Sequence, residues 1–226
     1  QGARNPHRAA HFGLYAFKPQ MPLASVDPGI QAHTGQALWL EPHKRNMALH
    51  IRAADAPPSI RLGPFTPALV LLVLVPLLIA VLGHGSVTQE REQGTLRMLH
   101  ASGMRGVPLV LGKWLGLCAG LALVLAPALL VGGWLLAAQQ GVRQALLLAL
   151  ALVLYYATWA ALAVAVSARC HTSRSALLVL LALWVGCVFV LPRMAASVVE
   201  QGMHLPTGER FWAAIQHDID NGLPGD

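Results

Sequence analysis

Four long apolar runs dominate the pattern of hydrophobic and polar positions, and a shorter polar stretch separates each run from the next. They cover residues 66–87, 107–138, 145–167 and 176–191. About 20 consecutive apolar residues are enough for a helix to cross the hydrocarbon core of a bilayer. The pattern therefore predicts an all-α, polytopic membrane protein in which four transmembrane helices are visible.

Proline and glycine mark the places where these predicted helices depart from regularity. Pro76 and Pro127 lie inside the first and second runs, where a missing N–H predicts a kink that neighbouring helices tolerate. Pro192 and Arg193 are expected to close the fourth run. The second run carries a small residue at every fourth position, a spacing that permits close helix packing: Gly112, Gly116 and Gly120.

Two polar regions flank this predicted transmembrane domain of residues 65–193. Residues 1–64 are rich in Pro, Gly and His and have little sustained period, so we interpret them as a loop or cap segment. Its expected elements are a helix over 4–16, an extended stretch over 19–28 and a broken helix over 35–50. Residues 194–226 form a second loop segment, with one amphipathic helix predicted over Glu209–Asp220.

Composition supports a membrane protein. The chain has 226 residues, 55% hydrophobic and 12% charged, whereas soluble domains carry about 25% charged residues. The formal net charge is +6, but the basic residues do not form a stripe interleaved with aromatics, so we expect no nucleic acid partner. The three cysteines lie in or beside the apolar runs and indicate neither a disulfide framework nor a zinc site.

Positive charge in the short connections predicts the orientation. The connections 88–106 and 168–175 contain five arginines, whereas 139–144 contains only Arg143. The first two should face the cytoplasm, which places residues 1–64 and 194–226 outside. The long first segment also carries basic residues, but long loops follow this rule poorly.

The connection 88–106 has a pattern of its own. Its first charged residues extend the preceding helix into water, and Gly94 can break that helix, because glycine weakens a helix interior. Thr95 is predicted to cap a second, short helix. Leu96 and Leu99 fall on one face of it, and Gly103 suits the position just after its end.

This connection resembles a known family. The sequence Glu-Arg-Glu-Gln-Gly-Thr-Leu-Arg-Met-Leu at 90–99, followed by Gly-Lys at 112–113, is similar to the first cytoplasmic loop of type-2 ABC exporter permeases. Further stretches resemble one subfamily of these permeases, and the resemblance covers most of the chain: Asn5-Pro6-His7-Arg8-Ala9-Ala10-His11, Asp27-Pro28-Gly29, Trp39-Leu40-Glu41-Pro42-His43 and Leu191-Pro192-Arg193.

The resemblance implies a transmembrane permease subunit of an ABC exporter in a bacterial cytoplasmic (inner) membrane. ATP and magnesium would be bound by a separate ATPase subunit, and a second permease subunit, identical or different, would complete the substrate path. The family has six spans, which implies one more before this chain and one more after it. The loop would be the coupling helix that docks onto the ATPase through Glu90, Arg91, Glu92, Gly94, Thr95, Leu96, Arg97 and Leu99.

The chain itself is predicted to be neither an ATPase nor another enzyme, with no cofactor of its own. Gly106–Lys113 has the wrong spacing for a phosphate-binding loop, and Trp114 stands where Ser or Thr should bind magnesium. Glu90 and Glu92 point to different faces of a helix, so a shared acid–base site is not expected. A merely solvated turn is the remaining alternative for this loop.

Other groups carry competing interpretations. His7 and His11 are four apart and would share a helix face as metal ligands, but no closed ligand set accompanies them, so no metal site is predicted. Tyr155, Tyr156 and Trp159 are expected to pack rather than to line a substrate path.

Two further function classes compete with the exporter: an ATP-independent secondary transporter, and a membrane anchor or assembly protein. Secondary transporters place ionisable residues in mid-membrane, and among the four runs only Lys113, near one end, is charged. That pattern favours the ABC permease. The sequence does not name its substrate.

Overall fold

The computed structural model describes residues 14–32, 34–40, 65–202 and 208–221. The chain divides into two compact units, one ending at Leu180 and the other beginning at Leu181. Four helical stretches in the described part are long and apolar enough to cross a membrane: Pro67–Glu92, Gly106–Gln140, Val142–Arg169 and Ser173–Val199. They correspond to the four predicted spans, and the all-α polytopic class is confirmed.

The first span is irregular around Pro76. It consists of α3 (Pro67–Leu69), a π-helical turn η4 (Val70–Leu74) and α4 (Val75–Gly83), in which Pro76 is the second residue. Proline has no N–H to donate to a carbonyl four or five residues earlier. Two hydroxyls from α8 donate to carbonyls at this distance instead: Tyr155 donates to the Leu72 carbonyl over 2.9 Å and Tyr156 to that of Leu71 over 3.1 Å.

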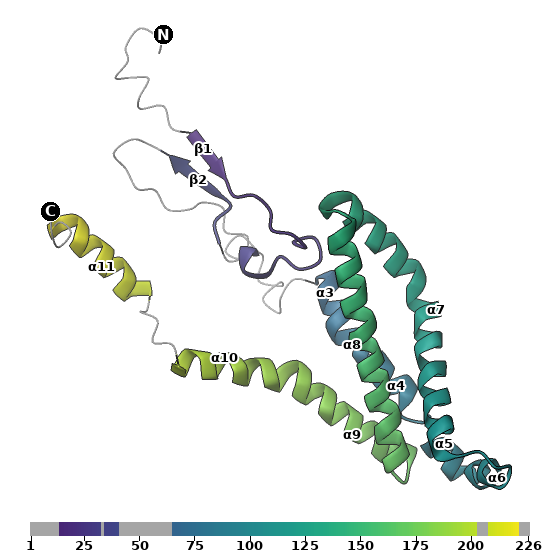
Figure 1. Cartoon of the computed structure of the whole chain (residues 1–226). Coiled ribbons are helices and arrows are strands. Elements are labelled where there is room, and N and C mark those ends of the chain that lie inside the picture. Colours follow the sequence, from purple (N-terminus) through teal and green to yellow (C-terminus); the bar gives the residue numbers. More distant parts are fainter. Residues whose placement is uncertain (1–13, 33, 41–64, 203–207, 222–226) are drawn as a thin grey trace. The chain divides into compact units, whose positions relative to one another are not determined.

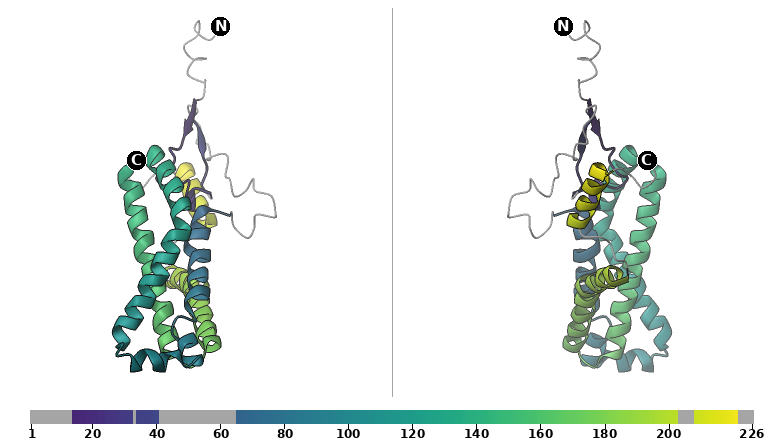
Figure 2. Two further views of the ribbon diagram at one scale, coloured as in Figure 1. Left: turned by 90° about the vertical axis from the view of Figure 1, so that its right-hand side faces the viewer. Right: turned by 90° about the vertical axis from the view of Figure 1, so that its left-hand side faces the viewer.

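The second and third spans are the long helices α7 (Gly106–Gln140) and α8 (Val142–Arg169), which lie side by side in Figures 1 and 2. Only Gly141 separates them, so the predicted connection over 139–144 is much shorter than expected. The chain can reverse in one residue because Gly141 has a φ of +97°, which glycine adopts without a side-chain clash. The helix α7 continues through Pro127 without a break.

The core of the first unit lies where α4 meets α8. Ile79 and Ala80 of α4, and Ala160 and Ala163 of α8, are almost completely buried. A Cβ added at Gly83 would lie 2.6 Å from the Cβ of Ala163, so this contact requires glycine. The buried residues of α8 follow the three- and four-residue spacing of one helix face: Leu152, Tyr156, Trp159, Ala160, Ala163, Val164 and Ser167.

The glycine ridge of α7 has no such contact. A Cβ added at Gly112, Gly116 or Gly120 would have no described atom within 4 Å. Within the described residues, the close helix contact is therefore made at Gly83, which the sequence pattern did not single out. The packing role of the three ridge glycines stays a prediction about a partner helix.

The N-terminal segment differs from its prediction. The strands β1 (Leu14–Phe17) and β2 (Ala37–Leu40) form an antiparallel pair, in which Tyr15 lies opposite Trp39 with ring centroids 4.6 Å apart. The helix predicted over 4–16 is thus wrong at 14–16 and the one predicted over 35–50 is wrong at 35–40, because residues 14–16 and 37–40 pair across strands and 35–36 are not helical. Residues 4–13 and 41–50 lie outside the described part.

The stretch 19–28 is not extended as predicted. Its backbone folds into turns, with Ala24 N–H donating to the Met21 carbonyl over 3.1 Å and Val26 N–H to that of Leu23 over 2.8 Å. A 3-10 helix, η2 (Gly29–Ala32), follows. The Val26 carbonyl accepts a hydrogen bond from Ala68 N–H over 3.1 Å, which joins this turn to the beginning of α3.

The boundary between the two units falls inside α9 (Ser173–Val185). The π-helical turn η5 (Gly186–Val190), α10 (Leu191–Gly202) and α11 (Gly208–Asn221) belong to the second unit. The helix does not end at Pro192 as expected, because helical structure continues through it to Gly202. As at Pro76, a π-helical turn immediately before accommodates the proline. The amphipathic helix predicted over Glu209–Asp220 is present as α11.

Candidate functional site

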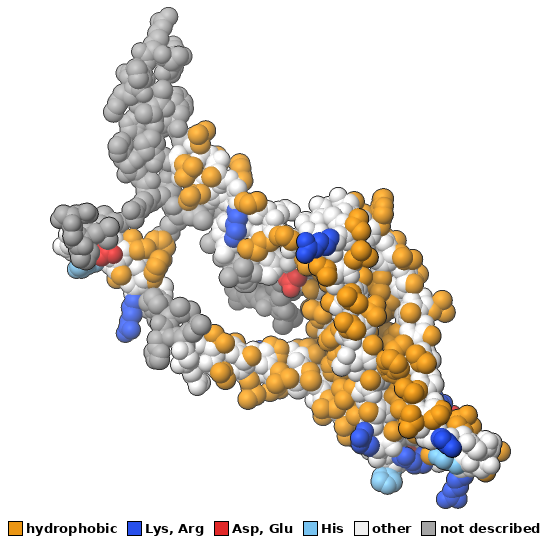
Figure 3. Space-filling model, in the orientation of Figure 1, with side chains coloured by type: hydrophobic (Ala, Val, Ile, Leu, Met, Phe, Trp, Pro, Cys, Tyr) orange, Lys and Arg blue, Asp and Glu red, His pale blue; other side chains and the backbone are white. Residues whose placement is uncertain are grey.

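The connection between α4 and α7 folds into two short helices, α5 (Thr88–Glu92) and α6 (Thr95–Ala101). They lie at the same end of the first unit as the turn between α8 and α9, whereas the α7–α8 turn lies at the opposite end (Figure 1). Figure 3 shows basic side chains gathered at this end, beside the hydrophobic surface of the long helices.

The beginning of α5 is held by α8. Val87 cannot cap a helix with its side chain, so the first N–H groups of α5 need an outside acceptor. The Ser167 hydroxyl oxygen accepts from the N–H groups of Val87 and Thr88 over 3.0 and 3.2 Å. Thr88 and Ser167 are fully buried, so this polar contact lies inside the helix packing.

Glu90 joins α5 to α6 and α7. Its carboxylate lies 2.7 Å from the ammonium of Lys113, and the two side chains are 26% and 34% exposed. The Thr95 hydroxyl also contacts the Glu90 carboxylate. Lys113, the charged residue near one end of the second apolar run, thus has an ion-pair partner within the chain.

Arg91 binds the end of α8. Its guanidinium donates to the Ala168 carbonyl over 2.9 Å and also to the Cys170 carbonyl. These carbonyls belong to the last turn and the C-cap of the helix, where the helix dipole places partial negative charge. The Arg91 cation therefore donates to the unpaired carbonyls and also interacts favourably with the helix dipole.

Glu92 binds the beginning of α9. Its carboxylate accepts from the backbone N–H and from the hydroxyl of Ser173, each over 2.8 Å. Ser173 is the first residue of α9, where partial positive charge and unpaired N–H groups favour an anion. Three consecutive charged residues of α5 therefore contact three different helices: α7, α8 and α9.

The two glycines of the loop set the limits of α6. Gly94 has a φ of +76° and occupies the N-cap position, so the prediction that Thr95 caps this helix is wrong: Thr95 is its first residue. Gly103 has a φ of +85°. Its N–H donates to the His100 carbonyl and that of Met104 to the Leu99 carbonyl, each over 3.1 Å. This is the Schellman pattern, which confirms the predicted place of Gly103.

The outer face of α6 differs from the apolar edge that the sequence indicated. Leu96 and Leu99 are half-buried, whereas Arg97 is exposed and Met98 is 73% exposed. Methionine is flexible and polarizable and is common at binding surfaces. Met98 falls outside the three-residue spacing that indicated Leu96 and Leu99, so this spacing does not single it out.

Tyr156 and Trp159 are buried in the helix packing, as predicted, and the backbone hydrogen bonds of both tyrosines give them a structural role. His7 and His11 lie outside the described residues. Within the described residues, no group of three or more His, Cys, Asp or Glu side chains is placed to hold a metal ion.

The fold is that of a multi-pass helical membrane protein with a structured charged loop at one end of its helices. The family follows from comparison with known proteins. The family model described as "ABC-2 family transporter protein" matches residues 10–223. The chain belongs to this family and is a permease component of an ABC transporter, a membrane subunit and not itself the catalytic ATPase. No curated protein and no solved structure matches the chain.

Proposed function

We propose that this chain is the transmembrane half of an ABC exporter and that the loop over 88–106 receives force from an ATPase subunit. The observation that supports this most strongly is the set of contacts made by Glu90, Arg91 and Glu92. They connect one short helix to α7, α8 and α9, so a displacement of the loop acts on three spans together.

Within this proposal the loop residues divide into two groups. Glu90, Arg91, Glu92 and Thr95 act inside the chain, where they hold α5 and α6 against the spans. Leu96 and Leu99 anchor α6 by their half-buried side chains. The docking surface is the exposed face around Met98 and Arg97, which fits an apolar groove with an acidic rim on the ATPase.

The wider assembly is also part of the proposal. The loop faces the cytoplasm of a bacterial cell, and residues 1–64 and 194–226 lie on the other side of the inner membrane. A second permease subunit, identical or different, completes the substrate path. ATP and magnesium are bound by the ATPase.

Capture of the ATPase by the full chain tests the docking surface. Met98→Asp should reduce co-purification of the ATPase subunit about tenfold or more, because desolvated anchor residues carry much of the binding energy. Gln93→Asp adds the same charge at an exposed position of the same loop and should leave capture unchanged. Equal capture of the ATPase by both variants would refute docking through Met98. In a separate transport assay, export that is insensitive to vanadate would favour an ATP-independent transporter.

A further inference from the structure

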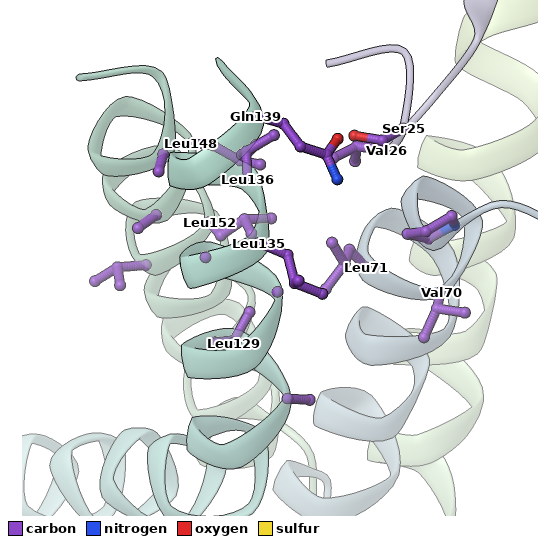
Figure 4. A pocket seen from close by; sticks show the side chains of 17 residues that line it. Ser25, Val26, Val70, Leu71, Leu129, Leu135, Leu136, Gln139, Leu148 and Leu152 are labelled. Atoms are coloured by element: carbon purple, nitrogen blue, oxygen red, sulfur yellow. The ribbon is translucent and has the colours of Figure 1, made fainter. Parts of the chain in front are cut away.

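A cavity of about 490 Å³ lies at the end of the first unit that is opposite the loop. It is lined by α7, α8 and the beginning of the first span and is open on one side, with the turn at Ser25 at one end (Figure 4). Its walls are apolar, with Leu71, Leu129 and Leu152 among the lining residues. Of the 17 residues that line it, only Ser25 and Gln139 have polar side chains, and both lie at the same end (Figure 4).

Two adjacent glycines make room for this cavity. Gly132 and Gly133 of α7 line it, and a Cβ added at either would have no described atom within 4 Å. Glycine weakens a helix interior, and neither glycine here permits a close helix contact of the kind made at Gly83. Because they carry no side chains, they leave space between α7 and its neighbours.

The polar end of the cavity lies near the expected membrane–water boundary. Gln139 is in the last turn of α7, next to the reversal at Gly141 and to Arg143. Trp134, one turn before, is 70% exposed, as is typical of tryptophan at the level of the lipid headgroups. From there the cavity runs toward the interior of the bilayer, past Leu129.

We propose that this cavity binds one acyl chain of a membrane phospholipid, with the ester end of the chain beside Gln139 and Ser25. An apolar cavity does not hold water stably, and left empty it forfeits the dispersion contacts of its lining atoms. Lipid tails are the apolar molecules that surround these helices. The volume lies in the range of about 300–1,000 Å³ that ligand sites occupy.

The two polar groups also restrict the occupant. An amide and a hydroxyl offer neutral hydrogen bonds, which suit an ester carbonyl, and no Lys, Arg, Asp or Glu is among the lining residues. The site thus favours the neutral glycerol-ester region of a phospholipid over an amphiphile with a charged group directly on its chain.

Photolabelling of the full-length protein tests this proposal. A phosphatidylethanolamine with a diazirine in its acyl chain is incorporated into membranes, the protein is purified in detergent to remove loosely held lipid, and the sample is then irradiated. Label should be at least fivefold higher on Leu71, Leu129 and Leu152 than on Leu130, which is 73% exposed on the outer side of α7.

Two variants give a matched comparison. Gly132→Phe fills the cavity and should lower its labelling at least fivefold, whereas Leu130→Phe adds an aromatic ring outside it and should not. Equal labelling of residues inside and outside the cavity, or no effect of Gly132→Phe, would overturn the proposal. If the Gly132→Phe protein does not insert into the membrane, the ratio of labelling on the cavity leucines to labelling on Leu130 in the wild type decides. No ATPase is required, so this result is independent of the docking test.

Discussion

The two ends of the first unit are built from different interactions. At the loop end, Glu90, Arg91 and Glu92 each bind a different helix, and a buried serine holds the beginning of α5. At the opposite end, one glycine reverses the chain and an apolar cavity separates the helices. Directional polar contacts fix the geometry where we propose that force enters, whereas the residues that line the cavity at the other end are almost all apolar.

The largest effect is expected at Arg91. Arg91→Ala leaves the carbonyls at the end of α8 without their charged donor and should lower the free energy of unfolding by about 2 kcal/mol. Denaturant unfolding in detergent micelles measures it. Arg97→Ala removes an exposed guanidinium from the same loop and should have little effect. Equal losses of unfolding free energy in Arg91→Ala and Arg97→Ala would show that the arginine that contacts α8 contributes no more to stability than the exposed one.

A smaller effect is expected at Gly94. A side chain at its φ of +76° is strained, so Gly94→Ala should destabilise the protein by about 1 kcal/mol. Gly106→Ala is the matched control, because Gly106 lies in a helix with open space around it. If both substitutions are neutral, the bend between α5 and α6 does not depend on glycine.

The Glu90–Lys113 ion pair should contribute less, because both side chains are partly exposed and screened by solvent. A double-mutant cycle with Glu90→Gln and Lys113→Met should give a coupling energy of about 0.5–1 kcal/mol that decreases with added salt. A coupling of zero at low salt would show that this contact does not join α5 to α7.

The smallest effect is expected at the opposite end. Gln139 is exposed, so Gln139→Leu should change the free energy of unfolding by less than about 0.5 kcal/mol. A loss as large as that of Arg91→Ala would contradict the contrast between the two ends.

Sequence reasoning was most successful where the cause is local. The four spans follow from uninterrupted apolar composition, and the positions of Gly94 and Gly103 from conformations that favour glycine. The partners of Arg91 were not predictable in this way, because they lie 77 and 79 residues further along the chain and only the fold brings them together. The same holds for the strand pair at Tyr15 and Trp39, which long-range pairing alone creates.

The prolines show a second limit. The missing N–H of Pro76 predicts an irregular helix, but not that a π-helical turn precedes it or that two tyrosines of α8 replace the donor. At Pro192 a π-helical turn also precedes the proline, and helical structure continues where an end was expected. The sequence shows where a proline interrupts the backbone hydrogen bonds of a helix, whereas the structure that accommodates the proline depends on its neighbours.

The most direct test of the central claim is a distance measurement across the end opposite the loop. Nitroxides at Leu130 of α7 and Leu147 of α8, both exposed, are placed in the complete complex with its ATPase after the three native cysteines are replaced. Trapping with ATP and vanadate should change their distance in pulsed EPR, and Arg91→Ala should abolish the change while the ATPase remains bound. An unaltered change in Arg91→Ala, or none in the wild type, would contradict transmission through this loop.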